Sequence, residues 1–380
     1  MARQSLAAMF AIVATLAAAP VGAQDDVFKI GVSAGLTGNN AVGDRAWRDG
    51  VELGAAAVNE AGGILGRKVV VIVEDNKSDP QEAVNVYRKM ISSDKVDIFL
   101  SGCVSAGNFA AAPHVVRAKI PMVLCSLLPN NSDHLKWAFS TLPPPVMEVE
   151  KRFGYLKEKT DIRKIAVLHD PTPYAMFQKK MMEGSAASYG LEVVAVESYR
   201  QDDADLSVQF SKMHAAGARA VMKIGSGGTT LTAAKDIKQL GLDMLLFAAG
   251  DDVGVFRTVA ETMGDGKFFF VATPPQVYET LPDGPLKAEI TKFLPLWTAK
   301  FAGRDPVWAS RGWDAVRIAK QAVEQAKSIE GPKLRDALEQ VTGLQGTASV
   351  YNMTAENHSG ITVNPLYLVT LVGGKVKVVY

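Results

Sequence analysis

The sequence lacks the motifs that would mark a metalloenzyme or a hydrolase. It has no H-E-x-x-H run, no closely spaced pair of cysteines, no P-loop and no G-x-S-x-G elbow. The adjacent His169 and Asp170 suggest acid–base chemistry, but no nucleophile motif accompanies them. The five histidines show no metal-ligand spacing: His114, His134, His169, His214 and His358. We therefore expect a protein that is not an enzyme, with no catalytic residues, no metal and no cofactor. An exported α/β hydrolase is the weaker alternative.

The sequence also lacks an excess of either charge. It carries 41 Lys and Arg against 40 Asp and Glu, and the two counts become equal without Arg3. A neutral surface argues against nucleic acid and anionic membranes as partners, because both attract basic patches. The 48% hydrophobic content can bury a large core, and the length of 380 residues suggests two domains.

Long apolar runs are missing after the first 23 residues, which themselves resemble a secretory signal. Arg3 is followed by an apolar, Ala-rich segment over 6–19 and by small residues at Val21 and Ala23. That segment is too short to span a bilayer, so we expect cleavage after Ala23 and a periplasmic mature protein. A retained membrane anchor is the alternative. No cysteine lies near the cut, which argues against lipidation.

Only two cysteines are present, Cys103 and Cys125. Each ends a predicted strand, and the helix between them would make the two strands parallel neighbours, about 4.8 Å apart. A disulfide is sterically possible, and an exported setting permits it. The alternative is a pair of free, buried thiols, which we favour slightly because cross-strand geometry in parallel sheets often suits a disulfide poorly.

Strands and helices alternate along most of the chain, which predicts an α/β fold with parallel sheets covered by helices on both faces. The predicted strands are 29–34, 68–74, 96–101, 121–125, 137–140, 164–169, 191–198, 220–225, 244–248, 267–271, 361–372 and 375–380. The predicted helices are 44–61, 106–118, 146–159, 175–189, 206–216, 229–240, 287–301, 308–326 and 333–340. Polar loops follow the strands, where open α/β sheets bind ligands.

Four segments carry a resemblance to a known family. They are KIGVSAGLTG from Lys29, NEAGGILGRKV from Asn59, EDNKSDPQEAVNV from Glu74 and KIAVLHDPTPY from Lys164. They resemble the type I periplasmic binding proteins, specifically the branched-chain amino acid (leucine/isoleucine/valine-binding) receptors. The resemblance implies two doubly wound lobes joined by three crossings, and a monomeric receptor that passes its ligand to the membrane permease of an ABC importer. A receptor that signals through a sensor kinase is the alternative.

The resemblance also divides the chain into lobes. One lobe comprises 25–142 with 274–342, and the other comprises 143–273 with 343–380. Proline clusters at 143–145 and 274–275 fall where two of the crossings are expected. The third crossing should lie near Gly343–Gly346.

Two loops of the first lobe are expected to hold a ligand carboxylate. One is the loop 102–107, where the N-terminal amides of the next helix would face an anion. Ser105 is either a ligand contact or the structural N-cap of that helix. The other is the loop 125–129, in which Leu127 and Leu128 replace small or hydroxyl residues of the family. These two leucines either line the site or pack in the core, and Trp47 has the same two alternatives. The expected contacts of this lobe are Thr37, Trp47, Cys103, Val104, Ser105, Ala106, Ser126, Leu127 and Leu128.

The second lobe supplies the remaining expected contacts. Tyr174 matches a tyrosine that faces the cleft in the family, and Gly225, Ser226 and Gly227 stand where the family has an aromatic ring. Asp251 matches the carboxylate that pairs with the ligand ammonium, or it caps the next helix. The changes imply a ligand bulkier than leucine, with an apolar body and one carboxylate. It is either a hydrophobic amino acid or an aromatic or aliphatic acid without an amine.

Overall fold

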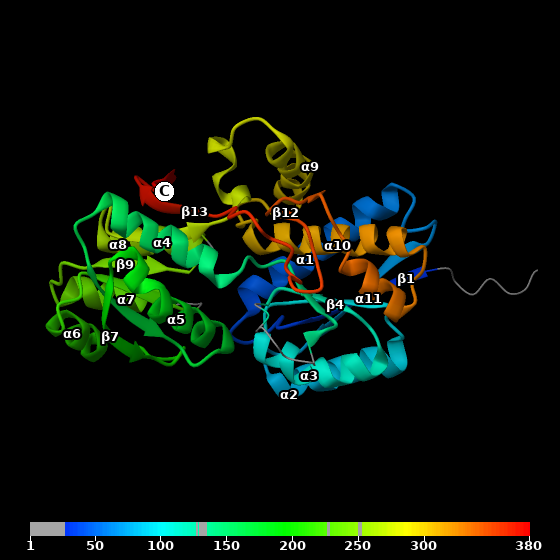
Figure 1. Ribbon diagram of the computed structural model, residues 1–380, viewed down its shortest axis with the longest axis horizontal. Coiled ribbons are helices and arrows are strands. Elements are labelled where there is room, and N and C mark those ends of the chain that lie inside the picture. The colour runs from blue at the N-terminus through cyan, green and yellow to red at the C-terminus, as the bar shows by residue number, and fades with distance from the viewer. Residues whose placement is uncertain (1–26, 127, 129–134, 226–228, 250–252) are drawn as a thin grey trace, which may run out of the picture.

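The computed structural model describes residues 27–126, 128, 135–225, 229–249 and 253–380. The predicted signal segment, Leu127, Ser226, Gly227 and Asp251 lie outside this part of the chain. Two groups of strands and helices lie side by side (Figure 1). Each group is built on its own sheet, and we call the two groups the first and second lobe.

The first lobe contains a five-stranded sheet whose strands are all parallel, in the order β2-β1-β3-β4-β5. Side chains alternate along β3: Ile98 and Leu100 pack toward α1 and α10, while Phe99 packs toward α2 and α3. The strands are Val27–Ala34 (β1), Lys68–Asp75 (β2), Ile98–Ser101 (β3), Met122–Leu124 (β4) and Ala138–Ser140 (β5). The helices are Ala41–Glu60 (α1), Pro80–Lys89 (α2), Ser105–Ala118 (α3), Pro285–Lys300 (α9), Val307–Ala326 (α10) and Gly331–Leu338 (α11).

The second lobe contains a seven-stranded sheet in the order β14-β13-β10-β9-β8-β6-β7. Its strands are Lys164–His169 (β6), Glu192–Ser198 (β7), Ala220–Ile224 (β8), Leu245–Ala248 (β9), Phe268–Ala272 (β10), Tyr367–Val372 (β13) and Lys375–Val378 (β14). The last two are antiparallel and are joined at Gly373–Gly374, as the sequence predicts. Helices α4 (Pro145–Lys159) and α5 (Pro173–Ser185) cover one face. Helices α6 (Ser207–Ala215), α7 (Thr229–Gln239) and α8 (Val253–Met263) cover the other.

The predicted alternation is confirmed, and the main differences concern three elements. Helix α2 was not predicted, although Asp79 caps it by accepting from the Glu82 amide and Pro80 follows as its first residue. Helix α8 was likewise missed. The predicted strand 361–372 begins only at Tyr367, because Pro365 has no amide hydrogen to donate to a neighbouring strand.

The segment 344–360 lies against the first lobe. Asp314 of α10 accepts hydrogen bonds from the amides of Thr347 (2.8 Å) and Ala348 (3.0 Å), and His358 Nδ1 lies 2.8 Å from the Ala138 carbonyl oxygen of β5. The lobe boundary predicted at residue 343 would assign this segment to the second lobe. Because these contacts are with residues of the first lobe, we propose instead that the third crossing runs through 361–366.

Helices α1 and α10 approach each other at two glycines. A Cβ at Gly50 would lie 1.9 Å from the carbonyl oxygen of Ala309, and a Cβ at Gly312 would lie 2.3 Å from that of Trp47. The two backbones therefore touch with no side chain between them. This contact joins the N-terminal part of the first lobe to the segment that returns from the second.

We expect Gly50→Ala to destabilise the protein by pushing these two helices apart. Overpacking costs about 1–3 kcal/mol, and the rigid backbone at Ala309 places this site at the upper end, above the gain of roughly 1 kcal/mol that alanine brings to a helix interior. Urea denaturation measures the change. Gly184→Ala in α5 is the matched control, because nothing lies within 4 Å of its added Cβ; equal free energies of unfolding for the two variants would contradict the prediction.

Candidate functional site

Asp44 holds two loops at the carboxyl edge of the first sheet. Its Oδ2 accepts from the amide of Gly35, after β1, and its Oδ1 accepts from the amide of Cys103, after β3, both at 2.6 Å. A Cβ at Gly102 would lie 2.6 Å from the same carboxylate, so glycine is required there. Asp44 is fully buried. Burial raises its pKa to about 6, and the two amide hydrogen bonds oppose that rise.

Cys103 and Cys125 form a disulfide, with their Cα atoms 4.6 Å apart. The slight preference for two free thiols was therefore wrong. Ladder pairing ends at Ser101 and Leu124, so both cysteines lie in the loops beyond the strands, where the constraint of the parallel ladder no longer applies. The bond joins the loop after β3 to the loop after β4.

The start of α3 offers uncapped donors. Val104 occupies the N-cap position without a side-chain cap, and Ser105 is the first helical residue, so the N-cap alternative for Ser105 is wrong. The Ser105 hydroxyl donates to Ser126 Oγ at 3.2 Å, and Asn108 Nδ2 donates to the same oxygen at 3.0 Å. The first amides of the helix carry the positive end of its dipole, so this end suits an anion.

The loop after β6 forms the facing wall on the second lobe. Thr172 caps α5 by accepting from the Ala175 amide at 3.2 Å, which places Tyr174 in the first turn. The Tyr174 hydroxyl is 3.4 Å from Glu148 Oε2. Burial and then the negative charge of Glu148 raise the pKa of Tyr174, so the phenol is neutral.

Gly225 follows β8 beside this wall. Its φ is +109°, and a Cβ would lie 2.4 Å from both Asp170 Oδ2 and the Tyr199 hydroxyl. No other residue fits without moving these groups. The small residue expected here from the sequence therefore has a local structural requirement as well as a place in the cavity.

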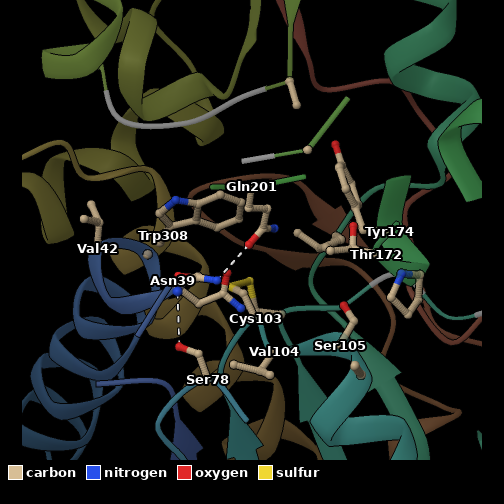
Figure 2. A pocket seen from close by; sticks show the side chains of 18 of the residues that line it. Asn39, Val42, Ser78, Cys103, Val104, Ser105, Thr172, Tyr174, Gln201 and Trp308 are labelled. Atoms are coloured by element: carbon tan, nitrogen blue, oxygen red, sulfur yellow. Dashed lines mark hydrogen bonds between the residues drawn. A yellow bond between two sulfur atoms is a disulfide. The ribbon is translucent and has the colours of Figure 1, made fainter. Parts of the chain in front are cut away.

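A cavity of about 320 Å³ lies between the lobes (Figure 2). None of its described lining residues is Lys, Arg, His, Asp or Glu, so its polar side chains are amides, hydroxyls and the Trp308 indole. The lining consists of Asn39, Asn40, Val42, Gly43, Ser78, Pro80, Cys103, Val104, Ser105, Ala106, Cys125, Leu142, Thr172, Pro173, Tyr174, Gln201, Gly225, Ala249, Val255 and Trp308.

Six of the predicted contacts line this cavity: Cys103, Val104, Ser105, Ala106, Tyr174 and Gly225. Others do not. Trp47 is fully buried and donates from Nε1 to the Leu100 carbonyl oxygen, so its core alternative holds. Thr37 is exposed and donates to Asp75, Ser126 lies buried behind Ser105, and Leu128 packs against the core between α2, α3 and the sheet.

Sequence reasoning missed the other lining residues, among them Asn39, Gln201 and Trp308. Asn39 belongs to the polar loop after β1, and Gln201 to the loop after β7, so their positions at carboxyl edges were available signals. Trp308 was taken only as the start of a helix, and nothing local indicates that the α10 N-terminus reaches the cleft. Asn39 and Gln201 meet across it, as Figure 2 shows, with Asn39 Nδ2 donating to Gln201 Oε1 at 3.1 Å.

A model of the family described as periplasmic binding protein matches residues 27–375. The chain belongs to the periplasmic binding protein family. This confirms the resemblance and assigns the chain to binding proteins, not enzymes. Among the described residues, no group of three or more His, Cys, Asp or Glu could hold a metal ion. No described helix is both long and apolar enough to cross a membrane.

Known relatives agree with the assignment. The chain is 25% identical over 338 residues to the leucine-, isoleucine-, valine-, threonine- and alanine-binding protein of Pseudomonas aeruginosa, which covers 88% of each chain. An extracellular ligand-binding receptor from Rhodopseudomonas palustris superposes with a TM-score of 0.84 at 19% identity, over 93% of this chain and 99% of that one. LivJ of Streptococcus pneumoniae, solved with isoleucine, gives 0.78 at 22% identity, again over 93% and 99%. The type I fold with two α/β lobes is thus shown.

Asp44 should make stability depend on pH. Because folding raises its pKa from 3.8 to about 6, the folded protein binds a proton more tightly than the unfolded chain between these values. The free energy of unfolding should therefore gain up to about 3 kcal/mol from this group as pH falls from 6 toward 4, and lose it again as pH rises.

Urea denaturation of wild type and Asp44→Asn at pH 4.5, 6 and 7.5 isolates the effect, since other groups titrate alike in both proteins. Wild type should gain stability relative to Asp44→Asn as pH falls. Parallel pH dependence of the two would show that Asp44 does not titrate in this range.

Removing the disulfide should destabilise the first lobe. The bond closes a loop of 22 residues, which the chain-entropy estimate values at about 3 kcal/mol. We expect the double variant Cys103→Ser, Cys125→Ser to lose that amount in thermal denaturation and to melt like wild type in a reducing agent. A melting temperature of the oxidised wild type that matches the double variant would refute this.

Proposed function

We propose that the protein is the periplasmic substrate-binding receptor of an ABC importer, and that it captures a small apolar carboxylate between its lobes for delivery to a membrane permease. The observation that carries this is an interlobe cavity with mostly apolar walls and uncharged donors at one end. Membership of the binding-protein family supports the receptor role.

The start of α3 is the proposed carboxylate site. The Ser105 hydroxyl and the Ala106 amide lie at the positive end of the helix dipole, and both residues line the cavity. Backbone amides bind anions well at such helix ends. Ser126 is buried behind Ser105; when its hydroxyl donates back to Ser105 Oγ, the Ser105 proton is free for the ligand carboxylate.

The body of the ligand is proposed to lie against apolar surfaces from both lobes. Val104, the disulfide and Trp308 belong to the first lobe, and the ring of Tyr174 faces them from the second. Burial of apolar area yields about 25 cal/mol per Å², which makes this wall the main source of affinity. Leu127, Ser226 and Gly227, which lie outside the described residues, are proposed as further ligand contacts.

The relatives suggest where to look for the ligand. The Pseudomonas aeruginosa protein is named for leucine, isoleucine, valine, threonine and alanine, and LivJ holds isoleucine. We therefore propose hydrophobic amino acids first and aromatic or aliphatic acids without an amine second. Asp251 is proposed as the partner of an ammonium in the first case.

Ligand binding should stabilise the fold measurably. A ligand at 100 times its dissociation constant adds about 2.7 kcal/mol, so differential scanning fluorimetry with isoleucine, leucine, 4-methylpentanoate and benzoate should show a raised melting temperature for at least one. Leucinamide and 3-methylbutanol, which lack the carboxylate, are the controls. Ser105→Ala should weaken binding of the active compound by about 0.5–3 kcal/mol. No shift with any apolar carboxylate would exclude this ligand class.

A further inference from the structure

Asp170 fixes the orientation of a cleft side chain on the second lobe. It is fully buried at the end of β6. Its Oδ1 accepts from the Thr172 amide at 3.0 Å and from the Thr172 hydroxyl, while its Oδ2 accepts from Gln201 Nε2 at 3.0 Å. A carboxylate accepts hydrogen bonds and cannot donate them. The nitrogen end of the Gln201 amide must therefore face Asp170.

The oxygen end of Gln201 consequently faces the first lobe. Its present partner is Asn39 Nδ2, at 3.1 Å, and the bond links the two lobes across the cavity (Figure 2). Asn39 is exposed, and an exposed neutral hydrogen bond is easily exchanged for another. An amide oxygen also has two lone pairs, so Gln201 Oε1 can accept from a second donor in the cavity that both residues line.

The two walls of the cavity thus differ in hydrogen-bonding character. The first-lobe wall presents donors, at Ser105 and the start of α3. The second-lobe wall presents an acceptor, Gln201 Oε1, which the buried carboxylate of Asp170 polarises through the amide. A ligand that satisfies both walls needs an acceptor group and a donor group.

We propose that Gln201, positioned by Asp170, is an acceptor subsite that selects carboxylates carrying a hydrogen-bond donor, either an ammonium or a hydroxyl group. This rests on the proposed function and names the ligand class more closely. Gln201 replaces its bond to Asn39 with a bond to that donor when ligand binds. The apolar body then lies between the two polar ends.

Isothermal titration calorimetry with two matched ligand pairs tests the subsite. Leucine against 4-methylpentanoate isolates the ammonium, and 4-hydroxybenzoate against benzoate isolates the hydroxyl. In wild type, the donor-bearing member of at least one pair should bind about 3- to 10-fold more tightly, the range expected for one hydrogen bond. Gln201→Met, of similar length, should remove that preference and leave the donor-free member within about 2-fold.

Asn39→Ala separates this role from simple bridging of the lobes. It removes the competing donor and should leave the preference for the donor-bearing ligand intact or increased. If Gln201 only bridges the lobes, both variants should weaken all four ligands equally, which would overturn the subsite. Gln201→Asn, which keeps the amide but shortens it, repeats the test if Gln201→Met lowers the melting temperature.

The outcomes also separate the subsite from the proposed function. Binding of none of the four carboxylates to wild type would overturn the proposed function, and the subsite with it. Binding without a donor preference, or a preference that Gln201→Met leaves unchanged, would overturn the subsite alone.

Discussion

The buried carboxylate of Asp44 is the constraint on which the first-lobe wall of the cleft depends. It accepts from the amides of Gly35 and Cys103, which follow different strands, and so sets the distance between their loops. The disulfide then ties the second of these loops to the one after β4. The hydrogen bonds and the disulfide together fix the relative positions of the loops after β1, β3 and β4. The proposed site for a ligand carboxylate needs such rigidity, because a backbone amide cannot be reoriented without moving the chain.

In the second lobe, a buried aspartate, Asp170, likewise accepts hydrogen bonds from loop groups. There the buried carboxylate organises the turn of Thr172 and the amide of Gln201, and it excludes any side chain at Gly225. Each lobe therefore uses one buried aspartate at the carboxyl edge of its sheet to position loop groups. The cavity lies between two preorganised walls, so ligand binding does not carry the entropic cost of ordering them.

Much of this architecture follows from local pattern, and the exceptions have physical causes. Strands β6 and β8 were predicted to within one residue, because buried strands are continuous apolar runs bounded by polar loops. Trp47 could not be assigned between core and cleft, since an amphipathic helix shows which residues face the sheet but not how far along the sheet the cleft reaches. The contacts of segment 344–360 to Asp314 and Ala138 could not be foreseen, because they join residues that are tens of positions or more apart in sequence.

The sequence by itself determined the alternation of strands and helices and the absence of recognisable catalytic motifs, because both depend on local patterns. The two-lobed fold and the cleft loop at Cys103–Ala106 were expected from contiguous motifs that resemble a known family. Only the tertiary structure decided that the cysteines are bonded, that Val104 and not Ser105 occupies the cap position, and that Asn39, Gln201 and Trp308 meet at one cavity. These three side chains come from the first strand's loop, the seventh strand's loop and a late helix. No local pattern encodes their proximity, which arises only when distant segments fold into two lobes with the cavity between them.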